Sequence, residues 1–82
     1  MTDTHIAIRT VNQDGNETYF RIKKTTVLSK LMNAYCEKNG LRRDSVRFIF
    51  NGVRIKDQHT ANDLKLQDQD VIDVMLEQLG GK

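Results

Sequence analysis

Three side chains in this sequence could carry chemistry: the thiol of Cys36 and the imidazoles of His5 and His59. Cys36 falls on an apolar helical stripe with no base near it in the sequence, so a buried, inert thiol is a better interpretation than a nucleophile. The two histidines lie far apart and lack companion ligands, which favours exposed, neutral imidazoles over a metal site. No acid/base pair or phosphate-binding loop accompanies them. The sequence therefore predicts a protein that is not an enzyme and that holds no metal or cofactor.

The charge pattern argues against nucleic acid as a partner, and the lack of a long apolar run argues against membranes. The 82 residues include 13 basic and 11 acidic side chains, a net charge of +2, and the two signs are interleaved. Basic pairs at 23–24 and 42–43 are too short to bind nucleic acid except weakly and in low salt. No apolar run approaches a membrane span, which needs ~18 residues or more. With 38% apolar residues, the chain is expected to form one small soluble domain.

The start of the chain predicts a β-hairpin. Residues 5–11 alternate, with Ile6 and Ile8 on one face, and alternation among β-branched residues is typical of a strand. An Asp-Gly pair at 14–15 is a strong turn signal, because glycine tolerates a positive φ. Alternation resumes over residues 18–23, which completes the hairpin.

The period of the apolar residues then changes and predicts a helix over about residues 27–39. Thr25 or Thr26 can cap its start, because a threonine oxygen accepts a hydrogen bond from the first turn. Gly40 is expected to end the helix in the left-handed conformation. The apolar stripe consists of Leu28, Leu31, Met32, Tyr35 and Cys36.

The second half of the chain returns to strands. Residues 46–50 alternate, a two-residue Asn-Gly turn follows at 51–52, and residues 53–55 return as a short strand. Residues 60–63 indicate a capped short helix, and residues 71–76 a last strand. One face of this last strand is expected to carry Ile72, Val74 and Leu76.

The resulting order is β-β-α-β-β-short helix-β, in which one helix and one sheet share a core, an α+β architecture. This order and a Gly-Gly pair near the C-terminus are similar to those of ubiquitin-like modifiers. More specifically, the chain resembles the SUMO family, the small ubiquitin-related modifiers, over residues 5–81. The blocks that carry the resemblance are 20–26 (FRIKKTT), 31–36 (LMNAYC), 46–55 (VRFIFNGVRI) and 70–74 (DVIDV).

The resemblance implies a β-grasp (ubiquitin-like) domain over residues 5–77, with a short tail at 1–4 and a flexible tail at 78–82. It also implies a protein modifier that is trimmed to Gly-Gly, activated with ATP, transferred as a thioester and joined to a substrate lysine. Gly81 would supply the carboxylate, and Lys82 would be a remnant of the precursor. Lacking Cβ, Gly80 and Gly81 can thread a narrow channel in a partner enzyme.

The partners that the resemblance implies are the SUMO activating and conjugating enzymes, ligases, proteases and substrate proteins. We expect a monomer in the nucleus and cytoplasm. The alternatives are a nonconjugated ubiquitin-like binding module, which has no need of the Gly-Gly pair, and an enzyme, which no constellation of residues supports.

In SUMO proteins, a groove between the second strand and the helix accepts short hydrophobic motifs that add a strand to the sheet edge. The resemblance places an apolar floor and a basic rim at this groove. Ordinary core packing and solvated surface charge are the alternative interpretations of these residues. The implied groove residues are Tyr19, Phe20, Arg21, Ile22, Lys23, Thr26, Lys30, Leu31, Ala34 and Lys38.

A further surface is implied where the conjugating enzyme binds SUMO noncovalently, near the first hairpin loop and the start of the last strand. Asn51 replaces an acidic residue that is often found there. The implied residues are Gln13, Asp14, Gly15, Arg47, Asp68 and Asp70.

Overall fold

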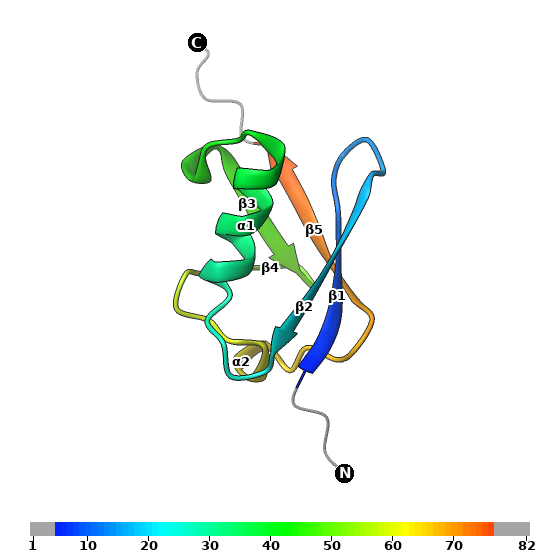
Figure 1. Ribbon diagram of the computed structural model, residues 1–82, viewed down its shortest axis with the longest axis vertical. Coiled ribbons are helices and arrows are strands. Elements are labelled where there is room, and N and C mark those ends of the chain that lie inside the picture. Colours follow the sequence, from blue (N-terminus) through cyan, green and yellow to red (C-terminus); the bar gives the residue numbers. More distant parts are fainter. Residues whose placement is uncertain (1–4, 77–82) are drawn as a thin grey trace.

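The computed structural model describes residues 5–76, so the expected tails with Gly80, Gly81 and Lys82 lie outside the described residues. Five strands form one mixed sheet in the order β2-β1-β5-β3-β4, and the long helix lies across one face of it (Figure 1). The elements are β1 His5–Val11, β2 Glu17–Lys23, α1 Ser29–Asn39, the 3-10 turn η1 Arg43–Ser45, β3 Val46–Phe50, β4 Val53–Arg54, α2 Ala61–Leu64 and β5 Asp70–Leu76. This arrangement confirms the expected α+β class and β-grasp order.

The first hairpin forms as its turn chemistry predicts. β1 and β2 pair antiparallel, and Gly15 takes a φ of 85° in the loop between them. The side chain of Asn12 closes this loop, because its Oδ1 accepts the N–H groups of Asp14 at 3.0 Å and Asn16 at 2.9 Å. In the middle of the sheet β1 pairs parallel with β5, so the first and last strands of the fold are neighbours.

Helix α1 begins two residues later than expected, and the predicted threonine cap is wrong. Leu28 occupies the N-cap position, and no side chain caps the helix. Instead, the backbone N–H of Leu28 donates to the carbonyl of His59 at 2.6 Å, so a distant loop satisfies this end of the helix. The predicted end is confirmed, because Gly40 is left-handed with a φ of 66°.

The second half of the chain follows the prediction with two differences. Asn51 and Gly52 both have positive φ, as a two-residue hairpin turn requires. Thr60 and Asp63 form the expected reciprocal capping box at the start of α2. The turn η1 was not expected. The predicted strand at 53–55 ends one residue early, because β4 includes only Val53 and Arg54. Leu76 shares a face of β5 with Ile72 and Val74, as predicted, but it is 47% exposed because β5 ends beyond the edge of the core.

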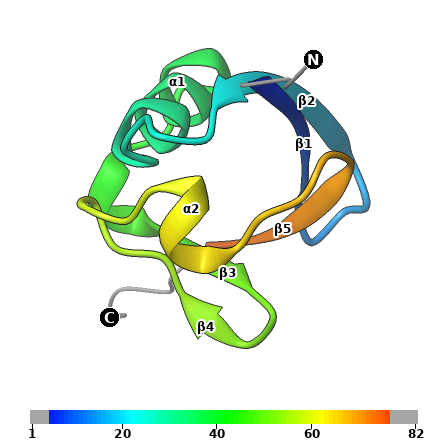
Figure 2. The same ribbon diagram turned by 90° about the horizontal axis from the view of Figure 1, so that it is seen from below.

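The core fills the space between α1 and the inner face of the sheet, and α2 lies across one end of it (Figure 2). All five residues of the predicted helical stripe are buried. Phe48 lies at the centre, 1% exposed, with its ring edge-on to Tyr35 at 5.6 Å between centroids. Within residues 5–76, neither helix has the length and apolar character needed to cross a membrane.

Candidate functional site

A surface groove of about 500 Å³ between β2 and α1 brings together most of the residues that the resemblance implied. We call it the β2–α1 groove. It includes all of the implied groove residues except Tyr19 and Lys38, and it adds His5. The lining residues are His5, Phe20, Arg21, Ile22, Lys23, Thr26, Lys30, Leu31 and Ala34.

The groove lies beside an open sheet edge. β2 is the first strand in the sheet order, and β1 is its only neighbour among the described residues. The outer edge of such a strand presents backbone N–H and C=O groups that can pair with another chain. The geometry therefore suits an extended segment that lies along β2 and places its side chains in the groove.

The apolar part of the groove is partly core and partly accessible surface. Leu31 is buried, so for this residue the interpretation as core packing is correct. Phe20 and Ile22 alternate inward along β2 but stay half-buried, packed against the core cluster. Ala34 is exposed on α1. A partner would therefore contact Phe20, Ile22 and Ala34, with Leu31 supporting them from below.

The charge of the groove is one-sided. Arg21, Lys23 and Lys30 line it, and none of its lining residues is Asp or Glu. All three basic residues are exposed. Cations that gather without balancing carboxylates attract negatively charged segments and speed their association.

The two implied residues outside the groove have other surroundings. Tyr19 is 59% exposed, and its hydroxyl donates to Glu17 Oε1 at 3.2 Å. Lys38 lies in the last turn of α1, one turn beyond Ala34. A positive charge at this end of a helix is stabilised by the helix dipole. Both remain near the groove elements without lining the groove.

Sequence reasoning missed His5 as a groove residue. In the antiparallel register His5 lies opposite Lys23, and it is half-buried rather than exposed as predicted. His59 is also half-buried, and its Nδ1 accepts the backbone N–H of Lys56 at 2.9 Å. Counting residue pairs along the β1–β2 hairpin from its Asp-Gly loop would have placed His5 opposite Lys23, a residue of the groove.

The residues implied to meet the conjugating enzyme fall into two separate groups. Gln13 Oε1 accepts the N–H of Leu76 at 3.5 Å, so Gln13, Asp14 and Gly15 lie at the C-terminal end of β5. Arg47 belongs to the same end, because it pairs with the residue before Leu76.

The second group lies at the opposite end of β5, where the strand begins (Figure 1). Asp68 Oδ1 accepts the N–H of Ala7 at 2.7 Å, and Asp70 Oδ2 accepts the N–H of Gln67 at 2.8 Å. Both carboxylates therefore hold the turn that leads into β5. The six implied residues do not form one patch.

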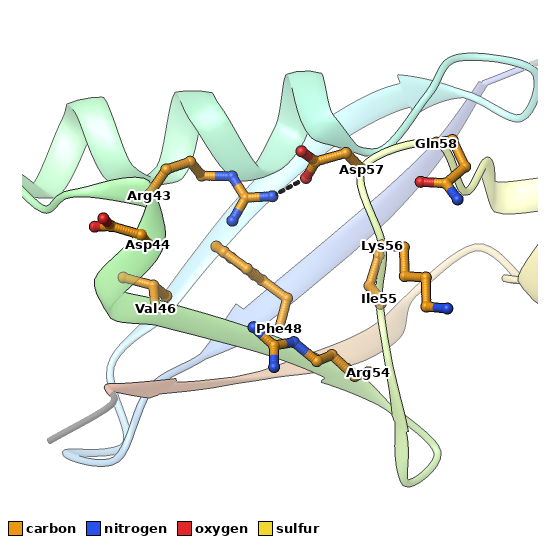
Figure 3. A pocket seen from close by; sticks show the side chains of 9 residues that line it. All are labelled: Arg43, Asp44, Val46, Phe48, Arg54, Ile55, Lys56, Asp57 and Gln58. Carbon is orange, nitrogen blue, oxygen red and sulfur yellow. Dashed lines mark hydrogen bonds and ion pairs between the residues drawn. The ribbon is translucent and has the colours of Figure 1, made fainter. Parts of the chain in front are cut away.

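A second concavity, of about 450 Å³, opens between η1, β3 and the loop after β4 (Figure 3). Arg43 forms an ion pair with Asp57 across it, and the Arg43 guanidinium lies 5.6 Å from the centroid of the Phe48 ring. Its apolar residues Val46 and Ile55 are buried. These contacts tie η1 to the loop after β4 and give the concavity a structural role.

The thiol of Cys36 has the inert surroundings that the sequence predicts. The side chain is 4% exposed on the inner face of α1. Burial raises the pKa of the Cys36 thiol, and the nearby positive charge of Arg43 opposes this only in part. A thiol with a raised pKa is a poor nucleophile at neutral pH.

We therefore expect iodoacetamide to alkylate Cys36 slowly in the folded protein at pH 8 and rapidly in denaturant.

The raised pKa also stabilises the fold below pH 9.0, the ordinary pKa of the thiol. This stabilisation is lost as the pH rises through the pKa of the folded state, because the unfolded thiol ionises first. Urea unfolding at pH 8 and pH 10.5, compared with Cys36→Ala, measures it. A pH dependence identical in the two proteins, or rapid alkylation of the folded protein, would contradict the prediction.

Among residues 5–76, no three His, Cys, Asp or Glu side chains gather in a way that could hold a metal ion. The β2–α1 groove best fits recognition of another molecule, because it lies beside the open edge of β2 and its lining residues are all basic or neutral.

The five-stranded sheet with a helix across it and a short capped helix before the last strand defines a ubiquitin-like β-grasp protein. A solved structure, the ubiquitin of Caldiarchaeum subterraneum, superimposes with a TM-score of 0.83 over 94% of this chain and 99% of its own, at 22% identity. That likeness supports the fold.

Sequence comparison identifies the branch. The family model described as "Ubiquitin-2 like Rad60 SUMO-like" matches residues 6–76. The chain is 47% identical to small ubiquitin-related modifier 2 of Arabidopsis thaliana, over 94% of this chain and 75% of that protein. It is 48% identical to the ubiquitin-like protein pmt3/smt3 of Schizosaccharomyces pombe, over 94% of this chain and 66% of that protein. The chain belongs to the SUMO-like family of ubiquitin-like proteins.

Family membership makes this protein a SUMO-like modifier, which places it within a conjugation pathway in general terms. Its relatives are modifiers rather than enzymes.

Proposed function

We propose that this protein is conjugated to substrate lysines through the carboxylate of Gly81, after removal of Lys82, ATP-dependent activation and thioester transfer. The observation that carries the proposal is 47% identity to a small ubiquitin-related modifier over 94% of the chain. The Gly-Gly pair supports it, because glycines, which lack Cβ, can thread a narrow channel in a partner enzyme. Gly81 follows the last residue of β5 by five positions in the sequence. In this chemistry the protein supplies an acyl group, and the catalytic cysteines belong to its partners.

Thioester formation tests the proposal. Two forms, residues 1–82 and residues 1–81, are mixed with SUMO activating and conjugating enzymes and ATP. We expect an adduct that thiol reductants cleave, from the 1–81 form alone, because Lys82 blocks the carboxylate of Gly81. The 1–81 form with Gly81→Ala is the matched control and should react at least tenfold more slowly. No adduct from either folded form would favour a nonconjugated binding module instead.

We also propose that the β2–α1 groove binds extended partner segments in which aliphatic side chains are flanked by acidic ones, as SUMO-interacting motifs are. The open edge of β2, the accessible side chains of Phe20 and Ile22, and the absence of Asp and Glu from the lining support this. Such a segment would add a strand to the sheet, with its acidic residues near Lys23 and Lys30.

The remaining partners follow from the same proposal. Activating and conjugating enzymes, ligases and proteases would act on the protein in the nucleus and cytoplasm, and the protein would act as a monomer. The groups at the two ends of β5, which include Gln13 and Asp68, would be separate contact points for the conjugating enzyme.

A further inference from the structure

The outer edge of β2, the first strand in the sheet order, is open, because β1 is its only neighbour within residues 5–76 (Figure 1). The β1–β2 ladder begins where the N–H of Asn12 donates to the carbonyl of Asn16 at 3.1 Å. The carbonyl of Thr18 also faces β1, since it accepts the hydroxyl of Thr10 at 3.1 Å. Bonded and non-bonded pairs alternate along an antiparallel ladder, so the even-numbered residues of β2 turn their N–H and C=O groups towards β1. The residues that turn these groups outward are Glu17, Tyr19, Arg21 and Lys23.

The sequence of β2, ETYFRIK, is complementary to its own reverse. A second copy of β2 can lie antiparallel along the open edge, with Phe20 of one copy opposite Phe20 of the other. Glu17 then faces Lys23 of the other copy. Tyr19 likewise faces Arg21. In this register all seven residues pair, and the residues that turn their backbone groups outward face each other, as a hydrogen-bonded ladder requires.

Other registers of the same two strands fit less well. A slide by one residue sets outward backbone groups against residues whose groups already turn towards β1. A slide by two residues leaves only five of the seven residues paired. In one direction it sets Arg21 against Arg21, and like charges directly opposite each other destabilise a sheet. In the other direction it leaves Lys23 outside the pairing, without the carboxylate of Glu17 opposite it.

The side chains that face each other in the full register are accessible. Glu17 and Lys23 are exposed. Within its own chain Glu17 accepts the hydroxyl of Tyr19 at 3.2 Å and lies 3.5 Å from Arg9 Nη1, and a carboxylate has acceptor sites for a further donor. The exposed ring of Tyr19 suits a guanidinium from the other copy. On the opposite face of the strand, the half-buried Phe20 would form an aromatic cross-strand pair with its own copy.

We propose that two copies of this protein associate through β2 with two-fold symmetry, so that their two sheets become one continuous sheet. One strand pair buries less than the about 1,200–2,000 Å² of stable complexes, so the association is weak, with a Kd on the order of 1 mM. The form that is conjugated is therefore still the monomer. Pairing occurs where copies are concentrated, and a paired β2 is closed to any other segment.

Sedimentation equilibrium of residues 1–82, at up to about 2 mM protein and low salt, tests the pairing. Glu17→Lys and Lys23→Glu should each raise the Kd at least tenfold. In each variant dimer two attractions are lost and two repulsions are gained, and each such term is worth about a factor of two in Kd. An equimolar mixture of the two variants should recover the natural Kd to within about threefold, because each mixed pair again sets a lysine against a glutamate at both sites.

Lys56→Glu is the matched control, because it makes the same charge change as Lys23→Glu on an exposed lysine of the loop after β4, the strand at the opposite edge of the sheet. It should associate as the natural sequence does. NMR locates the contact independently. In a mixture of labelled and unlabelled protein, isotope-filtered spectra should show a contact between the Phe20 rings of different copies, which no contact within one chain can produce.

Each of the other outcomes would overturn the proposal. A protein that stays monomeric at about 2 mM would mean that the charges of β2 serve only to keep its edge unpaired. A dimer that both single variants leave unchanged, or that their mixture fails to restore although NMR shows both folded, would place the contact outside β2. None of these results would affect the proposed conjugation, which the thioester assay tests separately.

Discussion

Replacing Lys23 and Lys30 together with glutamate is expected to weaken binding of a fluorescent acidic peptide, Ile-Val-Ile-Val-Glu-Glu-Glu, at least tenfold at 0.1 M salt. Both ammonium groups line the β2–α1 groove, one on β2 and one on α1, and no Asp or Glu among the lining residues balances them. The change removes two attractions and adds two repulsions. At about 0.5 kcal/mol for each of these four terms, the sum is about 2 kcal/mol, which exceeds the 1.4 kcal/mol that a tenfold loss requires. Anisotropy with the same peptide measures the loss.

Lys38→Glu is the matched control for this change. The resemblance placed Lys38 on the rim, whereas in the structure it lies one helical turn beyond the groove lining. We expect it to weaken binding less than threefold. Because all three lysines are exposed, thermal unfolding should change little in either protein. Equal losses from Lys38→Glu and from the double variant would mean that the general charge of the domain, and not the groove, attracts the peptide.

The second large effect is on stability. Phe48→Ala is expected to lower the free energy of unfolding by about 3–5 kcal/mol, because it leaves a cavity where the ring now packs against Tyr35. Phe48 also supports the Arg43 guanidinium, which closes the concavity of Figure 3. Small domains have only about 5–15 kcal/mol of stability in total, so the variant should lose a large fraction of it. Urea unfolding followed by circular dichroism measures the change.

Phe50→Ala is the comparison for the same chemical change on the same strand. Phe50 is half-buried and packs against the outside of the core cluster. We expect less than half of the loss at Phe48, since less apolar surface leaves the core. Similar losses at the two positions would contradict the central place of Phe48 in the core.

Most element ranges could be predicted because apolar periodicity records which side chains the fold buries. The helical stripe from Leu28 to Cys36 and the alternation of Ile6 and Ile8 both proved to be core positions. The start of α1 could not be predicted in this way. Its first donor bonds to the carbonyl of His59, a contact between two halves of the chain that no local pattern contains.

The candidate site was predictable only in part for a related reason. The resemblance identified the residues of β2 and the start of α1, which lie close together in the sequence. His5 joins them through strand register, and Lys38 leaves them because the groove ends near Ala34. The residues implied to meet the conjugating enzyme form two separate groups, because Gln13 and Asp68 lie at opposite ends of β5.

The parallel pairing of β1 with β5 has a mechanical consequence. β1 begins at one end of the sheet and β5 finishes at the other, and the two strands run side by side through its centre. A force that pulls on the domain from these two ends loads all the hydrogen bonds between the strands at once, in shear. The β1–β2 hairpin, by contrast, would peel apart one bond at a time when pulled from its open end. When such a domain is pulled from the end of β5 and the start of β1, the β1–β5 pairing is therefore expected to resist the force better than the hairpin.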